Sequence, residues 1–212
     1  MQKLIIKGKK ELIGKISISG SKNATLPILA ATILADRVKL KNVPLVKDIL
    51  TMIELLKFIG LDTKFLKNKN TLEIKNRKKK INTFAPYKLV KTMRAGILVL
   101  GPLLSKYGKA KISLPGGCAI GTRPVDLHLF ALKKLGAKIK IKNGYILAEA
   151  KKGLKGTSLT FPSISVGATE NALLAAFMAK GKTILKNCAI EPEIIDLILF
   201  LKKLGGKIKI SG

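Results

Sequence analysis

The chain has 212 residues, of which 47% are hydrophobic, and its 41 lysine and arginine residues against 12 acidic ones give a net charge of +29. This length and hydrophobic fraction suit one large globular domain or two small ones. No apolar run is long enough for a membrane span, no signal-peptide pattern opens the chain, and two cysteines do not make a disulfide framework. We therefore expect a cytoplasmic protein with no membrane partner.

The positive charge is nearly all lysine, and the only arginines are Arg37, Arg77, Arg94 and Arg123. Lysines are spread along the whole chain, which has three tyrosines and no tryptophan. Nucleic-acid-binding proteins usually cluster their charge and interleave aromatic residues that stack on bases. We therefore expect no nucleic-acid partner and keep a basic RNA-binding protein as the alternative of a different class. In such a lysine-rich chain, an arginine marks a place where the guanidinium fork matters.

The predicted elements recur three times along the chain. In the first unit, a polar cluster at Ser21 opens an apolar helix, a short strand ends near Pro44, a second helix covers 48–60 and an alternating strand covers 61–67. The second unit runs in the same order through 92–117, a helix over 126–136 and a strand over 137–144. The third runs through 167–192, a helix over 194–205 and a strand over 206–212. The offset between units is roughly 70–75 residues.

Local signals support this plan. Each second helix opens near an aspartate that would cap it or favour its N-terminus, and ends at a glycine. These residues are Asp48, Asp126 and Asp196 at the starts, and Gly60, Gly136 and Gly205 at the ends. The first helices are apolar on most faces, which is typical of helices in a core. We therefore predict an α/β (α+β) fold, an inside-out α/β barrel of three βαβαββ-like repeats with buried helices and sheets facing out.

The glycine-rich segment 116–127, GGCAIGTRPVDL, places Cys118 among three glycines with Arg123 close behind. A cysteine near a cation can have a lowered pKa and act as thiolate or acid, and an arginine fork suits phosphate or carboxylate. A free cysteine is more often a small buried hydrophobic residue, and we interpret Cys188 in that way, as a core or strand-end residue. The segment indicates a site for an anionic small molecule with a reactive thiol.

No cofactor or metal is expected. One histidine and two distant cysteines do not supply the usual four ligands of a zinc site, and the sequence has no Rossmann or P-loop glycine pattern.

Four blocks resemble, in order, the UDP-N-acetylglucosamine 1-carboxyvinyltransferase family. They are SGSKNATLPILAA (19–31), APYKLVKTMRAGILVLGPLL (85–104), LPGGCAIGTRPVDLH (114–128) and SVGATENALLAA (165–176). The resemblance runs from Leu4 to the last residue and implies the enolpyruvyl transferase-like fold. It implies that residues 1–19 are a strand of a second domain, that 20–212 form a near-complete first domain, and that the rest of the second domain is absent. The chain then stops in mid-motif, as an incomplete, weakly active or inactive fragment.

The resemblance also implies a reaction and its residues. The enolpyruvyl group of phosphoenolpyruvate moves to the 3′-hydroxyl of UDP-N-acetylglucosamine with release of phosphate, the first committed step of peptidoglycan synthesis. Cys118 is the implied catalytic acid, and Lys22 and Asn23 are the implied phosphoenolpyruvate contacts. The implied sugar-nucleotide contacts are Arg94, Arg123, Pro124, Val125, Asp126, Leu127, Ser163, Ser165, Val166 and Gly167.

Three further points qualify this interpretation. Ser163 stands where many relatives have a basic residue. His128 matches a family position near the substrate, but we leave it out of catalysis because a lone histidine on an amphipathic helix is more often a polar packing residue. The sister family, the 3-phosphoshikimate 1-carboxyvinyltransferases, shares the fold but lacks the cysteine loop, and it is the enzyme alternative.

Overall fold

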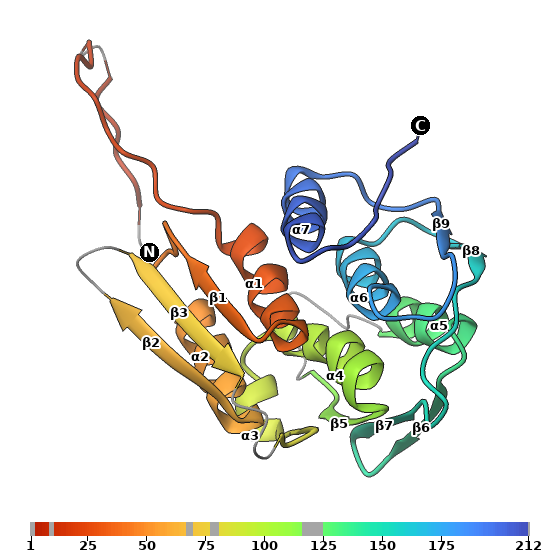
Figure 1. The fold of residues 1–212 in the computed structure, drawn as a ribbon. Coiled ribbons are helices and arrows are strands. Elements are labelled where there is room, and N and C mark those ends of the chain that lie inside the picture. The colour runs from red at the N-terminus through yellow and green to blue at the C-terminus, as the bar shows by residue number, and fades with distance from the viewer. Residues whose placement is uncertain (1–2, 9–10, 67–69, 77–80, 116–124, 212) are drawn as a thin grey trace.

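The structure, a computed structural model, describes residues 3–8, 11–66, 70–76, 81–115 and 125–211. Within these residues each predicted repeat contributes its own sheet (Figure 1). The strand orders are β1-β3-β2, β4-β5-β7-β6 and β8-β9.

The first repeat folds as two helices and an antiparallel sheet. Its elements are α1 (Lys22–Ala31), the 3₁₀ helix η1 (Thr32–Leu34), β1 (Arg37–Leu40), α2 (Lys47–Ile59), β2 (Leu61–Leu66) and β3 (Thr71–Asn76). The middle strand is β3, so Ile74 has Val38 of β1 on one side and Thr63 of β2 on the other. The predicted stop of α2 is confirmed, because Gly60 has the left-handed φ of 113° that glycine adopts most easily.

The second repeat follows the same order with an extra strand. Its elements are β4 (Phe84–Ala85), α3 (Tyr87–Val90), the 3₁₀ helix η3 (Arg94–Val99), α4 (Leu100–Tyr107), β5 (Lys109–Ser113), α5 (Asp126–Lys134), β6 (Lys138–Lys142) and β7 (Tyr145–Glu149). The expected single first helix is a 3₁₀ segment followed by α4. Pro102 has no N–H to donate, and it lies in the first turn of α4, where a missing N–H costs little. Pro27 shows that a proline is also accommodated inside α1. The predicted Asn143-Gly144 turn joins β6 to β7, with positive φ at both residues.

The third repeat departs from the prediction at its second helix and last strand. Its elements are β8 (Ser158–Thr160), α6 (Val166–Ala176), β9 (Ile184–Lys186) and α7 (Pro192–Lys203). Since proline is favoured at the first helical position, α7 begins at Pro192, and the expectation that Asp196 marks the helix start is wrong. The strand expected over 206–212 is also wrong for 206–211. In the other repeats this strand pairs with the next one, and no such partner follows 206–211 among the described residues.

Asp48 and Asp126 lie in the first turns of α2 and α5, as expected, although neither makes a side-chain capping bond. Their carboxylates therefore act on the helix dipole and do not cap a backbone N–H.

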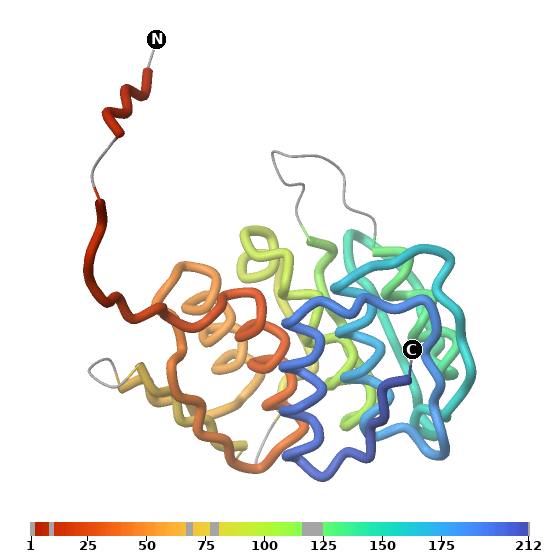
Figure 2. Tube along the Cα trace, turned by 90° about the horizontal axis from the view of Figure 1, so that it is seen from above, coloured from red at the N-terminus to blue at the C-terminus, as the bar shows by residue number. Residues whose placement is uncertain are grey.

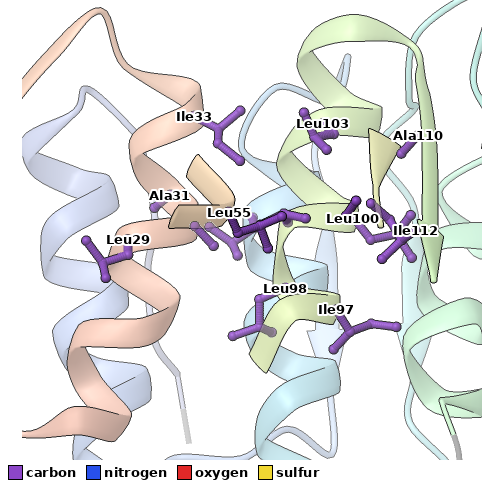
Figure 3. Packing of buried hydrophobic residues seen from close by; sticks show 14 of the residues in the cluster. Leu29, Ala31, Ile33, Leu55, Ile97, Leu98, Leu100, Leu103, Ala110 and Ile112 are labelled. Carbon is purple, nitrogen blue, oxygen red and sulfur yellow. The ribbon is translucent and has the colours of Figure 1, made fainter. Parts of the chain in front are cut away.

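The helices lie together in the middle of the molecule, with the sheets outside (Figure 1). Helix α1 packs on α2 and α7, and α6 packs on α4 and α5. Leu29 of α1, Leu55 of α2, Leu100 of α4 and Ile112 of β5 belong to one buried cluster. Figure 3 shows Leu55 and Leu100 on one side of α1 and Leu29 on the other. This confirms the predicted arrangement of buried helices and outer sheets.

The N-terminal segment extends away from this body (Figure 2). Residues 3–8 and 11–19 form no helix or strand. Their apolar side chains are 73–94% exposed; they are Leu4, Ile5, Ile6, Leu12, Ile13, Ile16 and Ile18. In the described part of the chain, no helix combines the length and apolar character needed to cross a bilayer.

Candidate active site

A cavity of about 490 Å³ lies where the first helix of each repeat begins. The starts of α1, η3 and α6 all contribute to its wall. Six of the predicted site residues line it, namely Lys22, Asn23, Arg94, Ser165, Val166 and Gly167. Other lining residues include Asp48, His128, Glu170 and Glu193. The threefold repeat therefore brings together residues that lie far apart in the sequence.

The starts of α1 and α6 are built in the same way. Ser21 and Ser165 are the N-cap residues, and each Oγ accepts a hydrogen bond over 3.3 Å from the backbone N–H three residues on. The threonine four residues on donates to the serine carbonyl, over 2.6 Å in α1 and 2.8 Å in α6. This geometry fixes the first turn of each helix at the cavity. Because helix N-termini carry partial positive charge and orphan N–H groups, the wall suits an anion.

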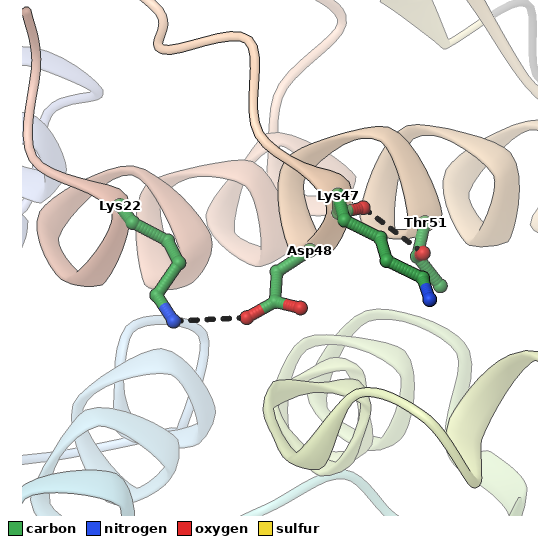
Figure 4. A network of polar contacts seen from close by, with 4 residues as sticks. All are labelled: Lys22, Lys47, Asp48 and Thr51. Carbon is green, nitrogen blue, oxygen red and sulfur yellow. Dashed lines mark hydrogen bonds and ion pairs between the residues drawn. The ribbon is translucent and has the colours of Figure 1, made fainter. Parts of the chain in front are cut away.

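Lys22 is held at the edge of the cavity by an ion pair with α2. Its Nζ lies 3.0 Å from Oδ2 of Asp48 (Figure 4). Nearby, Thr51 Oγ1 donates to the carbonyl of Lys47 over 3.0 Å. The Lys22 side chain is still 47% exposed, so its charge stays accessible to a ligand. The sequence identified Asp48 only as a residue that favours a helix start, and its place beside Lys22 was missed.

A glutamate of α6 is buried in the cavity wall. Glu170 is 6% exposed, although α6 is otherwise mostly apolar. Burial, with a smaller contribution from the charges of Glu193 and Glu191, raises the pKa of Glu170 to about 8. At neutral pH this carboxyl is therefore protonated and is able to donate a hydrogen bond. The sequence analysis missed Glu170, and its signal was the polar run Thr169-Glu170-Asn171 inside an apolar helix.

His128, which the sequence analysis left out of catalysis, is part of the cavity wall. It is on α5, is 3% exposed and lines the cavity. Burial and the charge of Arg94 lower the pKa of His128 to about 4, so the imidazole is neutral at neutral pH.

The other predicted contacts are placed as follows. Val125 is the N-cap of α5, Asp126 is exposed in its first turn, and Leu127 packs beside the cluster around Phe161. Ser163 is exposed two residues before the cap of α6. None of these four is among the residues that line the described cavity. Cys118, Arg123 and Pro124 lie outside the described residues.

Cys188 follows β9 and packs, half-buried, against the same cluster, which confirms its interpretation as a strand-end residue. Burial raises the pKa of its thiol, which makes it a poor nucleophile at neutral pH. Within the described ranges, no group of three or more metal-binding side chains is close enough to hold a metal ion.

The fold is shared with solved enolpyruvyl transferases. The chain matches the enolpyruvyl transferase NikO from Streptomyces tendae with a TM-score of 0.81 and 21% identity, over 97% of this chain and 48% of that one. It matches EPSP synthase from Acinetobacter baumannii with a TM-score of 0.71 and 18% identity, over 94% of this chain and 45% of that chain. These similarities define the class of fold, that of the enolpyruvyl transferases.

Residues 6–212 match the EPSP synthase (3-phosphoshikimate 1-carboxyvinyltransferase) family, and the chain belongs to this family. Its relatives of high sequence identity, by contrast, carry the name of the other enzyme, UDP-N-acetylglucosamine 1-carboxyvinyltransferase. Over 210 residues the chain is 63% identical to a UDP-N-acetylglucosamine 1-carboxyvinyltransferase of Pelagibacter ubique, covering 99% of this chain and 50% of that protein. It is 55% identical over 209 residues to the enzyme of that name from Rickettsia felis, covering 98% of this chain and 50% of that protein. The resemblance found in the sequence is thus confirmed, and the chain spans about half the length of these relatives.

Proposed function

We propose that this chain forms part of an enzyme that transfers the enolpyruvyl group of phosphoenolpyruvate to the 3′-hydroxyl of UDP-N-acetylglucosamine. Phosphate is released. The reaction is the first committed step of peptidoglycan synthesis and takes place in the cytoplasm. One observation carries the proposal. In a chain 63% identical to a UDP-N-acetylglucosamine 1-carboxyvinyltransferase, Lys22, Asn23 and Arg94 meet the capped start of α6 at one cavity.

The first half of the reaction adds the acceptor to phosphoenolpyruvate. A proton goes to the methylene carbon and positive charge develops at C2. The 3′-hydroxyl passes its own proton to a base as its oxygen forms a bond to C2. Lys22 and the N–H groups at the start of α1 are suited to the anionic groups of phosphoenolpyruvate, because both favour negative charge. We assign Cys118 as the acid, since a thiol gives a proton near neutral pH and its thiolate also forms an adduct at C2.

In the second half, the methylene proton is lost again, the bond between C2 and the phosphate oxygen breaks, and phosphate leaves. The sugar nucleotide stays in place through both halves. We assign its diphosphate to the start of α6, where Ser165, Val166 and Gly167 line the same cavity as Arg94. The segment from Arg123 to Leu127 and Ser163 complete the assigned contacts, with the exposed carboxylate of Asp126 available to the uracil base.

The other wall of the active site is assigned to a second domain. The chain spans about half the length of its relatives, and residues 1–19 are assigned to a strand of that second domain. The seven exposed apolar side chains of residues 3–18 support this assignment, because a strand with such side chains is stabilised by pairing and burial. Alone, the chain is expected to bind UDP-N-acetylglucosamine weakly and to turn over little, since domain closure excludes water.

Phosphate release measures the function directly. The 212-residue chain is compared with the same chain continued by the matching second half of the Pelagibacter ubique relative. UDP-N-acetylglucosamine and 3-phosphoshikimate are each supplied as the acceptor beside phosphoenolpyruvate. We expect turnover only in the longer protein and only with UDP-N-acetylglucosamine. Turnover of 3-phosphoshikimate would refute the substrate assignment, and equal rates in both proteins would refute the need for a second domain. Cys118→Ala should abolish the rate, while the matched variant Cys188→Ala should keep it.

A further inference from the structure

A fully buried asparagine of α6 is held by the second repeat. Asn171 Oδ1 accepts a hydrogen bond from the backbone N–H of Gly101 over 2.7 Å, and Nδ2 donates to the carbonyl of Ile97 over 3.1 Å. A backbone N–H can only donate and a carbonyl can only accept. These two partners therefore fix which end of the Asn171 amide is oxygen and which is nitrogen.

The second hydrogen of the amide nitrogen points at a histidine. Asn171 Nδ2 lies 3.1 Å from Nδ1 of His128. Because the amide nitrogen donates, Nδ1 must accept, and a neutral imidazole then carries its proton on Nε2. The ring is neutral at neutral pH, since burial and the charge of Arg94 lower its pKa to about 4.

Two glycines make room for this arrangement. A Cβ atom at Gly101 would lie 2.5 Å from Asn171 Oδ1, and one at Gly167 would lie 3.1 Å from Cε1 and 3.4 Å from Nε2 of His128. Both glycines are inside helices, where glycine is less favourable than alanine. The contact at Gly167 also places the Nε2 edge of the ring against the start of α6, where the cavity opens.

We propose that Asn171 is a positioning residue that holds His128 as its Nε2–H tautomer, so that His128 presents a neutral hydrogen-bond donor to a diphosphate oxygen in the cavity. The identity of that ligand rests on the proposed function, whereas the tautomer does not. The opposite tautomer would turn a lone pair towards the same oxygen and repel it. The other titratable or charged groups that line the cavity are Lys22, Arg94, Asp48, Glu193 and the protonated Glu170.

The tautomer can be measured directly, because His128 is the only histidine of the chain. Nitrogen-15 NMR of the 212-residue chain should show protonation at Nε2 across neutral pH, with titration well below the ordinary histidine pKa. In Asn171→Asp the donor to Nδ1 is replaced by a carboxyl oxygen. The proton should therefore move to Nδ1 and the His128 pKa should rise.

A matched control uses another buried asparagine. Asn76 donates to the carbonyl of Ile33 over 3.4 Å and to the Tyr107 hydroxyl over 3.0 Å, and it does not line the cavity. Asn76→Asp should lower stability and leave the His128 spectrum unchanged. Wild-type chain protonated at Nδ1, or charged at neutral pH, would overturn the proposal even if the Asn171 variant did not fold. So would a folded Asn171→Asp with an unchanged tautomer.

The donor role is tested by ligand binding to the same chain. Inorganic diphosphate and UDP-N-acetylglucosamine are titrated separately, and the Nε2 signal is followed. We expect it to shift with both ligands. His128→Gln keeps an N–H donor near the Nε2 position, whereas the shorter Asn does not reach it. Affinity should therefore fall about tenfold or more in His128→Asn and much less in His128→Gln. Equal losses would overturn the donor role, and so would a silent Nε2 signal at ligand concentrations where calorimetry shows binding. A shift with diphosphate alone would instead count against the proposed substrate.

Discussion

Replacing Glu170 by glutamine should change how stability depends on pH. The pKa of this carboxyl is raised from 4.5 to about 8 in the folded protein, first by burial and then by Glu193 and Glu191. Between these two values the folded state binds a proton that the unfolded state has lost. Stability therefore falls as the pH rises through this window and levels off above about pH 8. The difference corresponds to about 5 kcal/mol in all, of which about 3 kcal/mol is lost by pH 7.

Urea unfolding at pH 5, 7 and 9 measures this effect. At pH 5 glutamate and glutamine are both neutral, so wild type and Glu170→Gln should differ least. At pH 9 the variant should be more stable than wild type by several kcal/mol. The control is Glu54→Gln, which changes an exposed glutamate of α2 and should keep the wild-type pH dependence. If the stability curves of wild type and Glu170→Gln ran parallel from pH 5 to pH 9, burial would not be controlling the charge of Glu170.

The same titration should affect ligand binding. Ionised Glu170 adds a third carboxylate to a cavity that already contains those of Asp48 and Glu193. Phosphoenolpyruvate affinity should therefore decrease above about pH 8 in wild type and stay nearly constant in Glu170→Gln, as measured by calorimetry.

Three other predictions concern separate features. Cys118 should be alkylated faster than Cys188, because burial raises the thiol pKa of Cys188. Mass spectrometry of the folded chain should therefore find the first label at Cys118. Equal labelling of the two cysteines would contradict an activated thiol at Cys118. Gly101→Ala should cost about 1–3 kcal/mol in urea unfolding because its Cβ would press on Asn171, whereas Gly14→Ala, with open space around it, should cost nothing measurable. Asp48→Asn should change stability by less than about 1 kcal/mol, because its ion pair with Lys22 is part-exposed. The same variant should strengthen phosphoenolpyruvate binding several-fold, because it releases Lys22. Unchanged or weaker binding would show that Asp48 positions Lys22 for the ligand.

Local signals made much of the fold predictable. The stops at Gly60 and Gly205 and the turn at Asn143-Gly144 follow from backbone conformations that few other residues adopt. The internal repeat then predicted that three units with the same order of helices and strands follow one another along the chain. The prediction was wrong for 206–211, because a strand depends on a partner elsewhere in the chain and alternation alone does not supply one.

The lining of the cavity was predictable where a motif marks a helix start, as at Lys22 and Ser165. It was not predictable where a role depends on contacts between repeats. Asn171 meets a backbone N–H 70 residues away and His128 43 residues away, and no local pattern encodes either contact. The polar run that includes Asn171 inside the apolar helix α6 is a signal of a special environment, because buried polar groups need partners. It could not identify those partners.

The cavity does not share the strong positive charge of the chain. Its described lining has Lys22 and Arg94 against Asp48 and Glu193, while Glu170 and His128 are neutral at pH 7. These charges nearly cancel, although the whole chain carries +29. Attraction for an anion at this wall therefore comes mainly from directed donors, the N–H groups at the starts of α1 and α6 and Nε2–H of His128. Directed donors select an oxygen by position as well as by charge, and this favours one orientation of a substrate over general binding of anions.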